Sequence, residues 1–113
     1  MSQEIFDREA ALQQMGGDEE LMAELVEVFF EDLPERLQEI EAALAASDAE
    51  SLQKAAHTLK GAVGNFAAHA AYEMTFELET WAKEGGVEGA DQIYAKLVEQ
   101  IELLKAALGE LLQ

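Results

Sequence analysis

The chain has 113 residues, the usual size of one domain, and half of them are hydrophobic. Its formal net charge of −17 would repel phosphate backbones and anionic lipids, so we expect neither a nucleic acid nor a membrane as partner. The absence of cysteine excludes disulfides and thiolate metal sites. No apolar run is long enough to cross a bilayer, and residues 1–5 show no signal peptide, so we expect a cytoplasmic protein or a domain of one.

The first two predicted helices have clear end signals. Asp7 is a suitable N-cap for a short helix over about residues 7–15, and the pair Gly16-Gly17 ends it. Asp18 then caps a long second helix, whose first turn is acidic as a helix N-terminus prefers. Pro34 falls within that second helix, so we expect a kink there and not a break.

Three more helices are predicted in the rest of the chain. The run Ser47-Asp48-Ala49-Glu50 has the pattern of a capping box and predicts a third helix from there to about residue 65. A fourth is predicted over about 68–84 and a fifth over about 90–112, with a glycine-rich loop at 85–89 between them.

Each of the four longer helices carries one apolar stripe, with steps of three and four residues. The stripes outside the third helix comprise Leu21, Leu25, Phe29, Leu33, Leu37, Ile40, Leu44, Met74, Leu78, Trp81, Ile93, Leu97, Ile101, Leu104, Leu108 and Leu111. Four amphipathic helices with short connections bury such stripes best against one another. The sequence therefore predicts an all-α protein, a single domain over residues 1–113, folded as an antiparallel four-helix bundle with a short additional N-terminal helix at one end.

The third helix differs from the rest of the chain in charge. None of the 24 acidic residues lies between positions 51 and 72. The same window holds both histidines, His57 and His69, and two of the seven basic residues, Lys54 and Lys60. A non-acidic segment in so acidic a protein is a candidate functional region.

His57 is expected on the outside of the third helix. At about 100° per residue it lies nearly opposite the apolar side of that helix, which is formed by Leu52, Ala55, Leu59, Ala62, Val63 and Phe66. This position argues against a histidine that merely fills the core, and leaves an ordinary surface histidine as the alternative interpretation. His69, near the start of the fourth helix, is expected to be a surface residue.

The neighbours of His57 favour a functional interpretation. The outward stripe of the third helix holds, within two turns of the ring, Gln53, Lys54, Lys60, Gly61, Gly64 and Asn65. Glycine inside a helix costs about 1 kcal/mol relative to alanine, so Gly61 suggests clearance for a large partner close to the ring. For Gly64 the C-terminus of the helix is an equally good explanation.

These side chains suit phosphoryl transfer. A neutral imidazole is a nucleophile toward phosphorus, and part of the histidine population is neutral near pH 7. A phosphoryl group would bring more negative charge onto the protein, and Lys60, with Lys54 as possible support, could offset it.

The run Ala56-His57-Thr58-Leu59-Lys60-Gly61, followed by Gly64-Asn65, resembles the signature of the histidine phosphotransfer (HPt) domain of bacterial phosphorelays. The resemblance covers about residues 5–80, and its further positions are Phe6-Asp7, Leu12, Gly17-Asp18, Leu21, Phe29, Leu33-Pro34, Asp48 and Leu52. The chain departs from the family at Ala67, where many members carry glycine in the turn after the motif.

The resemblance implies a four-helix-bundle core with His57 as an exposed phosphoacceptor. It implies Lys60 as the charge partner of the phosphoryl group, and Gly61, with Gly64, as the small residues that admit the partner. The implied partners are a sensor histidine kinase and a response-regulator receiver domain, which supplies the reacting aspartate and Mg²⁺. The domain itself is then a phosphocarrier and not an enzyme, with no cofactor and no metal of its own.

Two alternatives remain open from the sequence. The first is a helical docking module that is never phosphorylated, and the second is the phosphoacceptor domain of a chemotaxis-type kinase. No nucleotide-binding loop and no Glu-x-x-His pair is present, so self-phosphorylation and a di-iron site are not expected. The high charge and the lack of cysteine favour a monomer.

Overall fold

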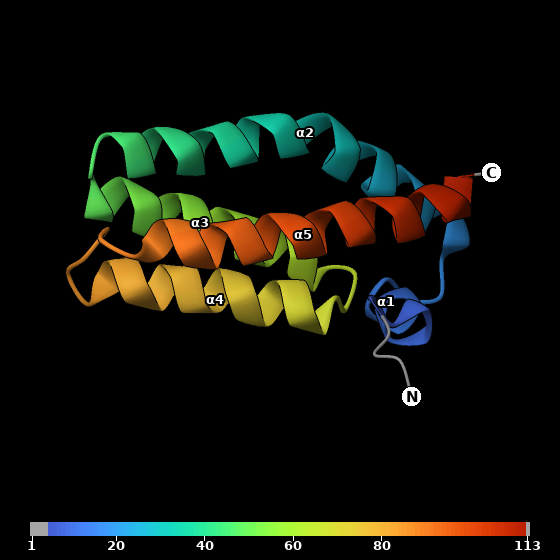
Figure 1. Cartoon of the computed structure of the whole chain (residues 1–113). Helices are drawn as coiled ribbons and strands as arrows, with labels where there is room; N and C mark the ends of the chain where they lie inside the picture. The colour runs from blue at the N-terminus through green and yellow to red at the C-terminus, as the bar shows by residue number, and fades with distance from the viewer. Residues whose placement is uncertain (1–4, 113) are drawn as a thin grey trace.

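A computed structural model describes residues 5–112 of the chain (Figure 1). Its helices are α1 (Arg8–Gln14), α2 (Glu19–Ala45), α3 (Ala49–Gly64), α4 (His69–Lys83), α5 (Ala90–Gly109) and the short 3₁₀ helix η1 (Glu110–Leu112). No strand occurs in this part of the chain. Residues 1–4, in which no signal peptide is predicted, and Gln113 lie outside the described residues.

Helices α2 to α5 form the predicted antiparallel four-helix bundle. Each packs against the next in the chain, and α5 returns to α2 and closes the bundle (Figure 1). Across this closure the hydroxyl of Tyr94 donates a hydrogen bond to the Glu41 carboxylate at 2.6 Å. Burial raises the pKa of Tyr94 and the bond to Glu41 raises it further, so the phenol remains a donor at neutral pH. The predicted fold class is confirmed.

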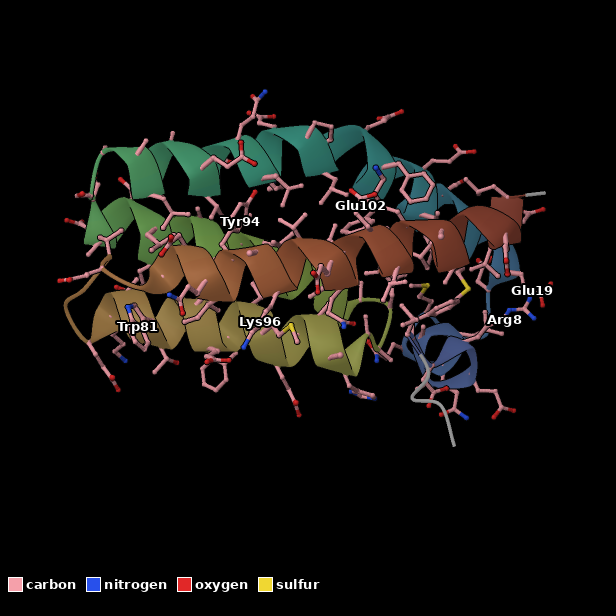
Figure 2. The ribbon with its side chains drawn as sticks, in the orientation of Figure 1. Arg8, Glu19, Trp81, Tyr94, Lys96 and Glu102 are labelled. Atoms are coloured by element: carbon pink, nitrogen blue, oxygen red, sulfur yellow. The ribbon has the colours of Figure 1, made fainter. Side chains whose placement is uncertain are left out.

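The short helix α1 covers one end of the bundle, beside the turn between α3 and α4 (Figure 1). The backbone N–H of Asp7 donates to the carbonyl of Ala67 at 3.2 Å, which joins the start of α1 to that turn. A small cluster of Ala11, Met22 and Ala67 is buried beneath α1. The exposed Arg8–Glu19 ion pair lies at the same end (Figure 2). The sequence prediction that the first helix caps the bundle is confirmed.

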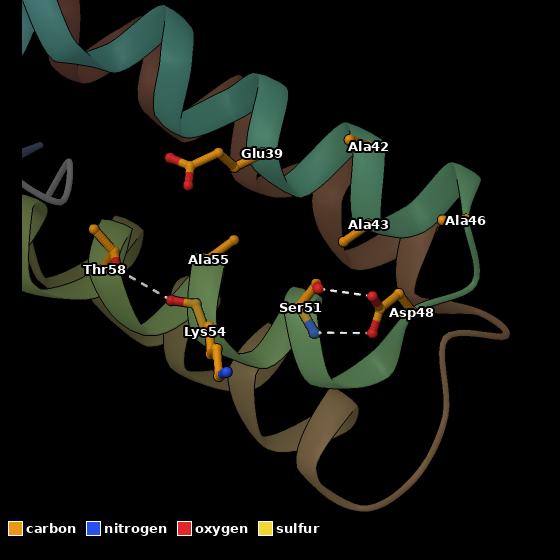
Figure 3. Close-up of a pocket in the computed structure, with 9 residues that line it drawn as sticks. All are labelled: Glu39, Ala42, Ala43, Ala46, Asp48, Ser51, Lys54, Ala55 and Thr58. Carbon is orange, nitrogen blue, oxygen red and sulfur yellow. Dashed lines mark hydrogen bonds between the residues drawn. The ribbon is translucent and has the colours of Figure 1, made fainter.

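Two of the predicted helix caps are confirmed and the third is wrong. The Asp7 and Asp18 carboxylates each accept a hydrogen bond from the backbone N–H three residues on, at 3.0 Å. The predicted capping box begins one residue too early, because Asp48 is the N-cap of α3. Its carboxylate accepts bonds from the hydroxyl and the N–H of Ser51, at 2.7 and 3.1 Å (Figure 3), and these bonds lower its pKa. Ser47 instead takes a left-handed backbone conformation, with φ at 52°.

The apolar stripes form the core with two exceptions. The largest fully buried side chains come from all four long helices. Leu21 and Trp81, both predicted in these stripes, are 37% and 42% exposed. Trp81 lies at the end of the bundle (Figure 2), where its indole N–H donates to the Glu88 carbonyl at 2.9 Å and its ring lies close to Gly89. It therefore fastens the α4–α5 loop. Helix α2 continues through Pro34 without a break, which confirms that part of the prediction, while the kink expected there stays a prediction.

The conformation of Ser47 gives a stability prediction. A left-handed conformation costs a residue with a Cβ about 1 kcal/mol, and Ser47 is exposed, so its side chain contributes little packing. Ser47→Gly should therefore raise the free energy of unfolding by up to about 1 kcal/mol in a urea titration. Ala67→Gly is the matched control, because Ala67 has the same φ but a buried methyl group whose loss offsets the gain. A larger gain at Ala67 than at Ser47 would contradict this account.

Candidate functional site

His57 lies near the middle of α3, the helix that packs against both α2 and α4. Because α3 packs against two helices, its apolar side is wide, and Ala55, Ala56 and Leu59 around the histidine are all buried. The side chain of His57 itself is 68% exposed, as the helical wheel predicts. A rigid, doubly packed helix therefore presents one imidazole ring to solvent.

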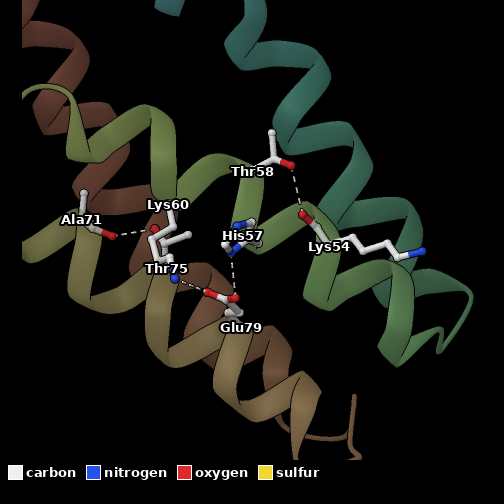
Figure 4. Close-up of polar contacts among 7 residues, drawn as sticks. All are labelled: Lys54, His57, Thr58, Lys60, Ala71, Thr75 and Glu79. Atoms are coloured by element: carbon white, nitrogen blue, oxygen red, sulfur yellow. Dashed lines mark hydrogen bonds and ion pairs between the residues drawn. The ribbon is translucent and has the colours of Figure 1, made fainter.

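The ring is held by a residue that the sequence analysis did not identify. Nδ1 of His57 lies 2.9 Å from Oε2 of Glu79 on α4 (Figure 4). The Glu79 side chain is only 14% exposed. Because a carboxylate accepts hydrogen bonds, the contact favours the ring tautomer with its proton on Nδ1. The second ring nitrogen, Nε2, then carries the free lone pair and points away from Glu79.

Lys60 lies between α3 and α4 and not on the open surface predicted for it. Its ammonium lies 2.7 Å from Oε1 of Glu79, and its side chain is 16% exposed (Figure 4). The contact is a short ion pair between the two helices. The ring of Phe76 covers the ammonium, with the ring centroid 4.9 Å away. The prediction that Lys60 shares the outward stripe is wrong, because α4 shields this side of α3.

Glu79 is ionised in spite of its partial burial. Burial alone raises the pKa of the carboxyl, but hydrogen bonding and charge from Lys60 and His57 together lower it below its usual value. One carboxylate oxygen faces each of these two α3 side chains (Figure 4). The arrangement is thus a row of lysine, carboxylate and imidazole between two helices.

The two glycines of the motif differ in their surroundings. A Cβ at Gly61 would meet nothing within 4 Å, so no packing requires glycine there. A Cβ at Gly64 would lie 3.4 Å from the Tyr72 ring, and Gly64 is the last residue of α3. That distance is an ordinary van der Waals contact, so a methyl group would fit against Tyr72 at position 64, whereas Gly61 keeps the surface one turn beyond His57 open.

The remaining predicted residues surround the ring without contacting it. Gln53 is half-buried and Asn65 is exposed as the C-cap of α3. The Lys54 side chain is 77% exposed and forms an ion pair with Glu50 at 3.3 Å, while its carbonyl accepts a hydrogen bond from the Thr58 hydroxyl (Figure 4). His69 is exposed at the start of α4, as predicted.

The His57 ring lies on an open surface. A hollow does lie between α2 and α3, but it is lined by residues such as Glu39, Asp48, Lys54 and Thr58 and not by His57 (Figure 3). Within residues 5–112, no three His, Asp or Glu side chains come together as a metal site would need. No helix in the same range is long and apolar enough to span a membrane. The site is thus an exposed imidazole ring on a helix surface and not a group enclosed in a pocket.

The comparisons with known proteins agree with this geometry. The family model of the Hpt domain matches residues 24–112. Histidine-containing phosphotransfer protein B (HptB) from Pseudomonas aeruginosa PAO1 superimposes with a TM-score of 0.87 at 26% identity, over 96% of this chain and 95% of HptB. The HPT domain of a sensor hybrid histidine kinase from Shewanella has the same fold, with a TM-score of 0.84 at 21% identity over 96% of this chain and 93% of that domain. No curated protein sequence matches significantly.

The lowered pKa of Glu79 predicts how its contribution to stability changes with acid. A carboxyl group with a lowered folded-state pKa stabilises the protein above its unfolded value of 4.5, and this contribution is lost as the pH falls through the folded value. The stability difference between wild type and Glu79→Gln should therefore shrink as the pH falls below 4.5. Urea unfolding of both proteins at several acidic pH values measures it. A difference that grows in this range would show that the carboxylate is not stabilised by its partners.

Proposed function

The chain belongs to the Hpt domain family, and we propose that Nε2 of His57 is the atom that carries its phosphoryl group. The observation that carries this proposal is the geometry of the ring: Nδ1 is engaged by Glu79, and the rest of the ring is open to solvent. As a histidine phosphotransfer module the domain needs one exposed nucleophile and an unobstructed approach to it. His57 and the open surface at Gly61 meet these two needs.

The ring tautomer with its proton on Nδ1 determines how the phosphoryl group is transferred. The lone pair of Nε2 attacks phosphorus, the N–P bond forms, and the O–P bond of the donor's aspartyl phosphate breaks with its electron pair going to the aspartate carboxylate. No proton has to leave, because Nδ1 keeps its hydrogen and the ring takes a positive charge. In the reverse step an aspartate oxygen attacks phosphorus and the N–P electron pair returns to Nε2. The chain thus contributes the nucleophile and its orientation.

The partners that suit this chemistry are a receiver domain and, upstream of it, a sensor histidine kinase. The window 51–72 has no carboxylate of its own, so the surface of α3 around the ring does not repel an incoming phosphoryl group. We infer that the domain acts as a phosphocarrier and not as an enzyme, with Mg²⁺ and the reacting aspartate supplied by the receiver. A monomeric protein in the cytoplasm fits this role.

His57→Gln tests the phosphoacceptor directly. Incubation with an active kinase and receiver pair should label the wild type with an acid-labile phosphoryl group and leave the variant unlabelled. His69→Gln is the matched control and should keep full labelling, because His69 lies on another helix and matches no motif position. Label that persists in His57→Gln, or a wild type that binds receivers but is never labelled, would favour the docking-module alternative.

Gly61→Gln tests whether partner access explains the glycine. Its side chain would point into open space, so the fold should persist, and Gly61→Ala should even stabilise the helix by up to about 1 kcal/mol. Transfer from a phosphorylated receiver should fall by about tenfold or more, because the added side chain obstructs the approach to Nε2. Transfer kinetics together with thermal melts measure both effects.

The matched control for this prediction is Gly109→Gln. Gly109 also lies in a helix with open space around its missing Cβ, but on α5. That control should transfer at the wild-type rate. An unfolded Gly61→Gln protein, or one that is stable and transfers normally, would end the access explanation.

A further inference from the structure

Helix α3 carries two lysines near His57, and they lie on opposite sides of the ring. Lys54 is three residues before the histidine and Lys60 three after, which places them about 60° to either side of it. Lys60 lies on the α4 side, against Glu79, whereas Lys54 lines the hollow between α2 and α3 (Figure 3). Because Nε2 points away from Glu79, a phosphoryl group on it would lie on the side of the ring nearer Lys54.

The two lysines also differ in how freely they can move. The Lys60 side chain is 16% exposed and lies beneath the Phe76 ring. The Lys54 side chain is 77% exposed, and its partner Glu50 is exposed as well, so their ion pair contributes little to stability. Lys54 can therefore leave its carboxylate at little cost, whereas the departure of Lys60 would leave a partly buried carboxylate without its cation.

In the described part of the chain, the other carboxylates that line the hollow beside Lys54 are already engaged. Glu39 of α2 pairs with the Arg36 guanidinium. Asp48 accepts two hydrogen bonds from Ser51 (Figure 3). Glu50 is thus the carboxylate with which a phosphoryl group on His57 would compete for the Lys54 ammonium.

Helix geometry brings the imidazole ring toward Lys54. The Cα–Cβ bonds of an α-helix tilt toward its N-terminus, so the His57 side chain leans over the turn that carries Lys54. Side chains three residues apart are neighbours on a helix surface. The flexible four-carbon stem of a lysine lets its ammonium swing from Glu50, one turn before Lys54, to a group on His57, one turn after it.

We propose that Lys54 leaves Glu50 when His57 is phosphorylated and pairs with the phosphoryl group on Nε2. The proposal rests on His57 being the phosphoacceptor. A phosphoryl group carries close to two negative charges at neutral pH, so it attracts the ammonium more strongly than the single charge of Glu50 does. The new pair stabilises the phosphorylated domain. Lys54 and Glu50 together thus set how much phosphoryl group the domain holds at equilibrium with a receiver.

Phosphorus-31 NMR of the phosphorylated domain tests the contact. The probe is phosphoramidate, which needs no docking surface: Nε2 attacks its phosphorus, the P–N bond breaks, and ammonia leaves. A cation beside the phosphoryl group favours its doubly charged form and so lowers the pKa of its last ionisation. Lys54→Met should raise that pKa by about 0.5 unit, while Lys54→Arg, which keeps the charge, should leave it near the wild-type value.

Glu50→Gln tests the competition for the ammonium. The substitution should lower the pKa of the phosphoryl group, because Lys54 loses its competing partner. In a Lys54→Met background the same substitution should have a clearly smaller effect, because no ammonium is left to release. Equal effects in the two backgrounds would mean that Glu50 acts only through its own charge, and the proposed exchange would be wrong.

The equilibrium with a phosphorylated receiver gives a second readout. A pKa shift of about 0.5 unit corresponds to about threefold in an equilibrium constant, so Lys54→Met should shift the phosphoryl group about threefold toward the receiver at a pH above that pKa. Lys105→Met is the matched control and should change neither measurement, because Lys105 also pairs with a carboxylate of its own helix but lies on α5.

Two outcomes would overturn the proposal while leaving the phosphoacceptor in place. One is an unchanged phosphoryl pKa in folded Lys54→Met, and the other is an equal shift in Lys105→Met. A wild type that phosphoramidate never labels would instead refute His57 as the phosphoacceptor, and the proposal with it.

Discussion

The partly buried carboxylate of Glu79 is the constraint on which the site depends. An ionised group with so little exposure is stable only if both oxygens have partners, and the two partners, Lys60 and His57, come from the facing helix. Meeting this requirement ties α4 to α3 beside the apolar core and orients the imidazole ring at the same time. The energetic requirement of a buried charge and the chemical requirement of an oriented nucleophile are satisfied by the same two contacts.

The overall acidity of the protein makes the local charge balance important. Adding a phosphoryl group to a chain with a net charge of −17 would be opposed by any carboxylate nearby. This electrostatic repulsion is weakened mainly because residues 51–72 contain no acidic residue. The Glu79 carboxylate beside the ring is already paired with Lys60. The site before transfer is therefore an ion pair beside a neutral ring, and the charge that arises on the ring during transfer meets Glu79.

Much of the fold was predictable because its signals are local. Asp7 and Asp18 cap the helices that the sequence assigns to them, and the apolar stripes define the bundle. His57 was predictable as an exposed ring for the same reason, because helix periodicity alone sets its direction. The start of α3 was misassigned because Ser47 and Asp48 are both good caps, and only the left-handed backbone at Ser47 decides between them.

The partner of the ring was not predictable from local pattern, because Glu79 is 22 residues away on another helix. A non-local signal does exist. In an antiparallel helix pair, residues at equal distances from the turn face each other, and positions 57 and 79 lie equally far on either side of Ala68, in the turn between α3 and α4. Using that signal requires knowing the turn to within a residue, whereas helix ends predicted from sequence are uncertain by more than that.

The spacing of His57, Lys60 and Gly61 follows from helix geometry, because α4 packs against α3 on one side of the face that carries His57. A step of three residues turns the helix by about 300° and a step of four by about 400°, so Lys60 and Gly61 lie on opposite sides of His57, roughly 100° apart. With α4 on the Lys60 side, the lysine is carried into the interface with Glu79, while Gly61 stays on the open side. Exchanging the two residue types would place a lysine in the path of the partner and leave Glu79 without its counter-ion. The order lysine then glycine is thus the one that keeps the buried charge paired and the approach to Nε2 free.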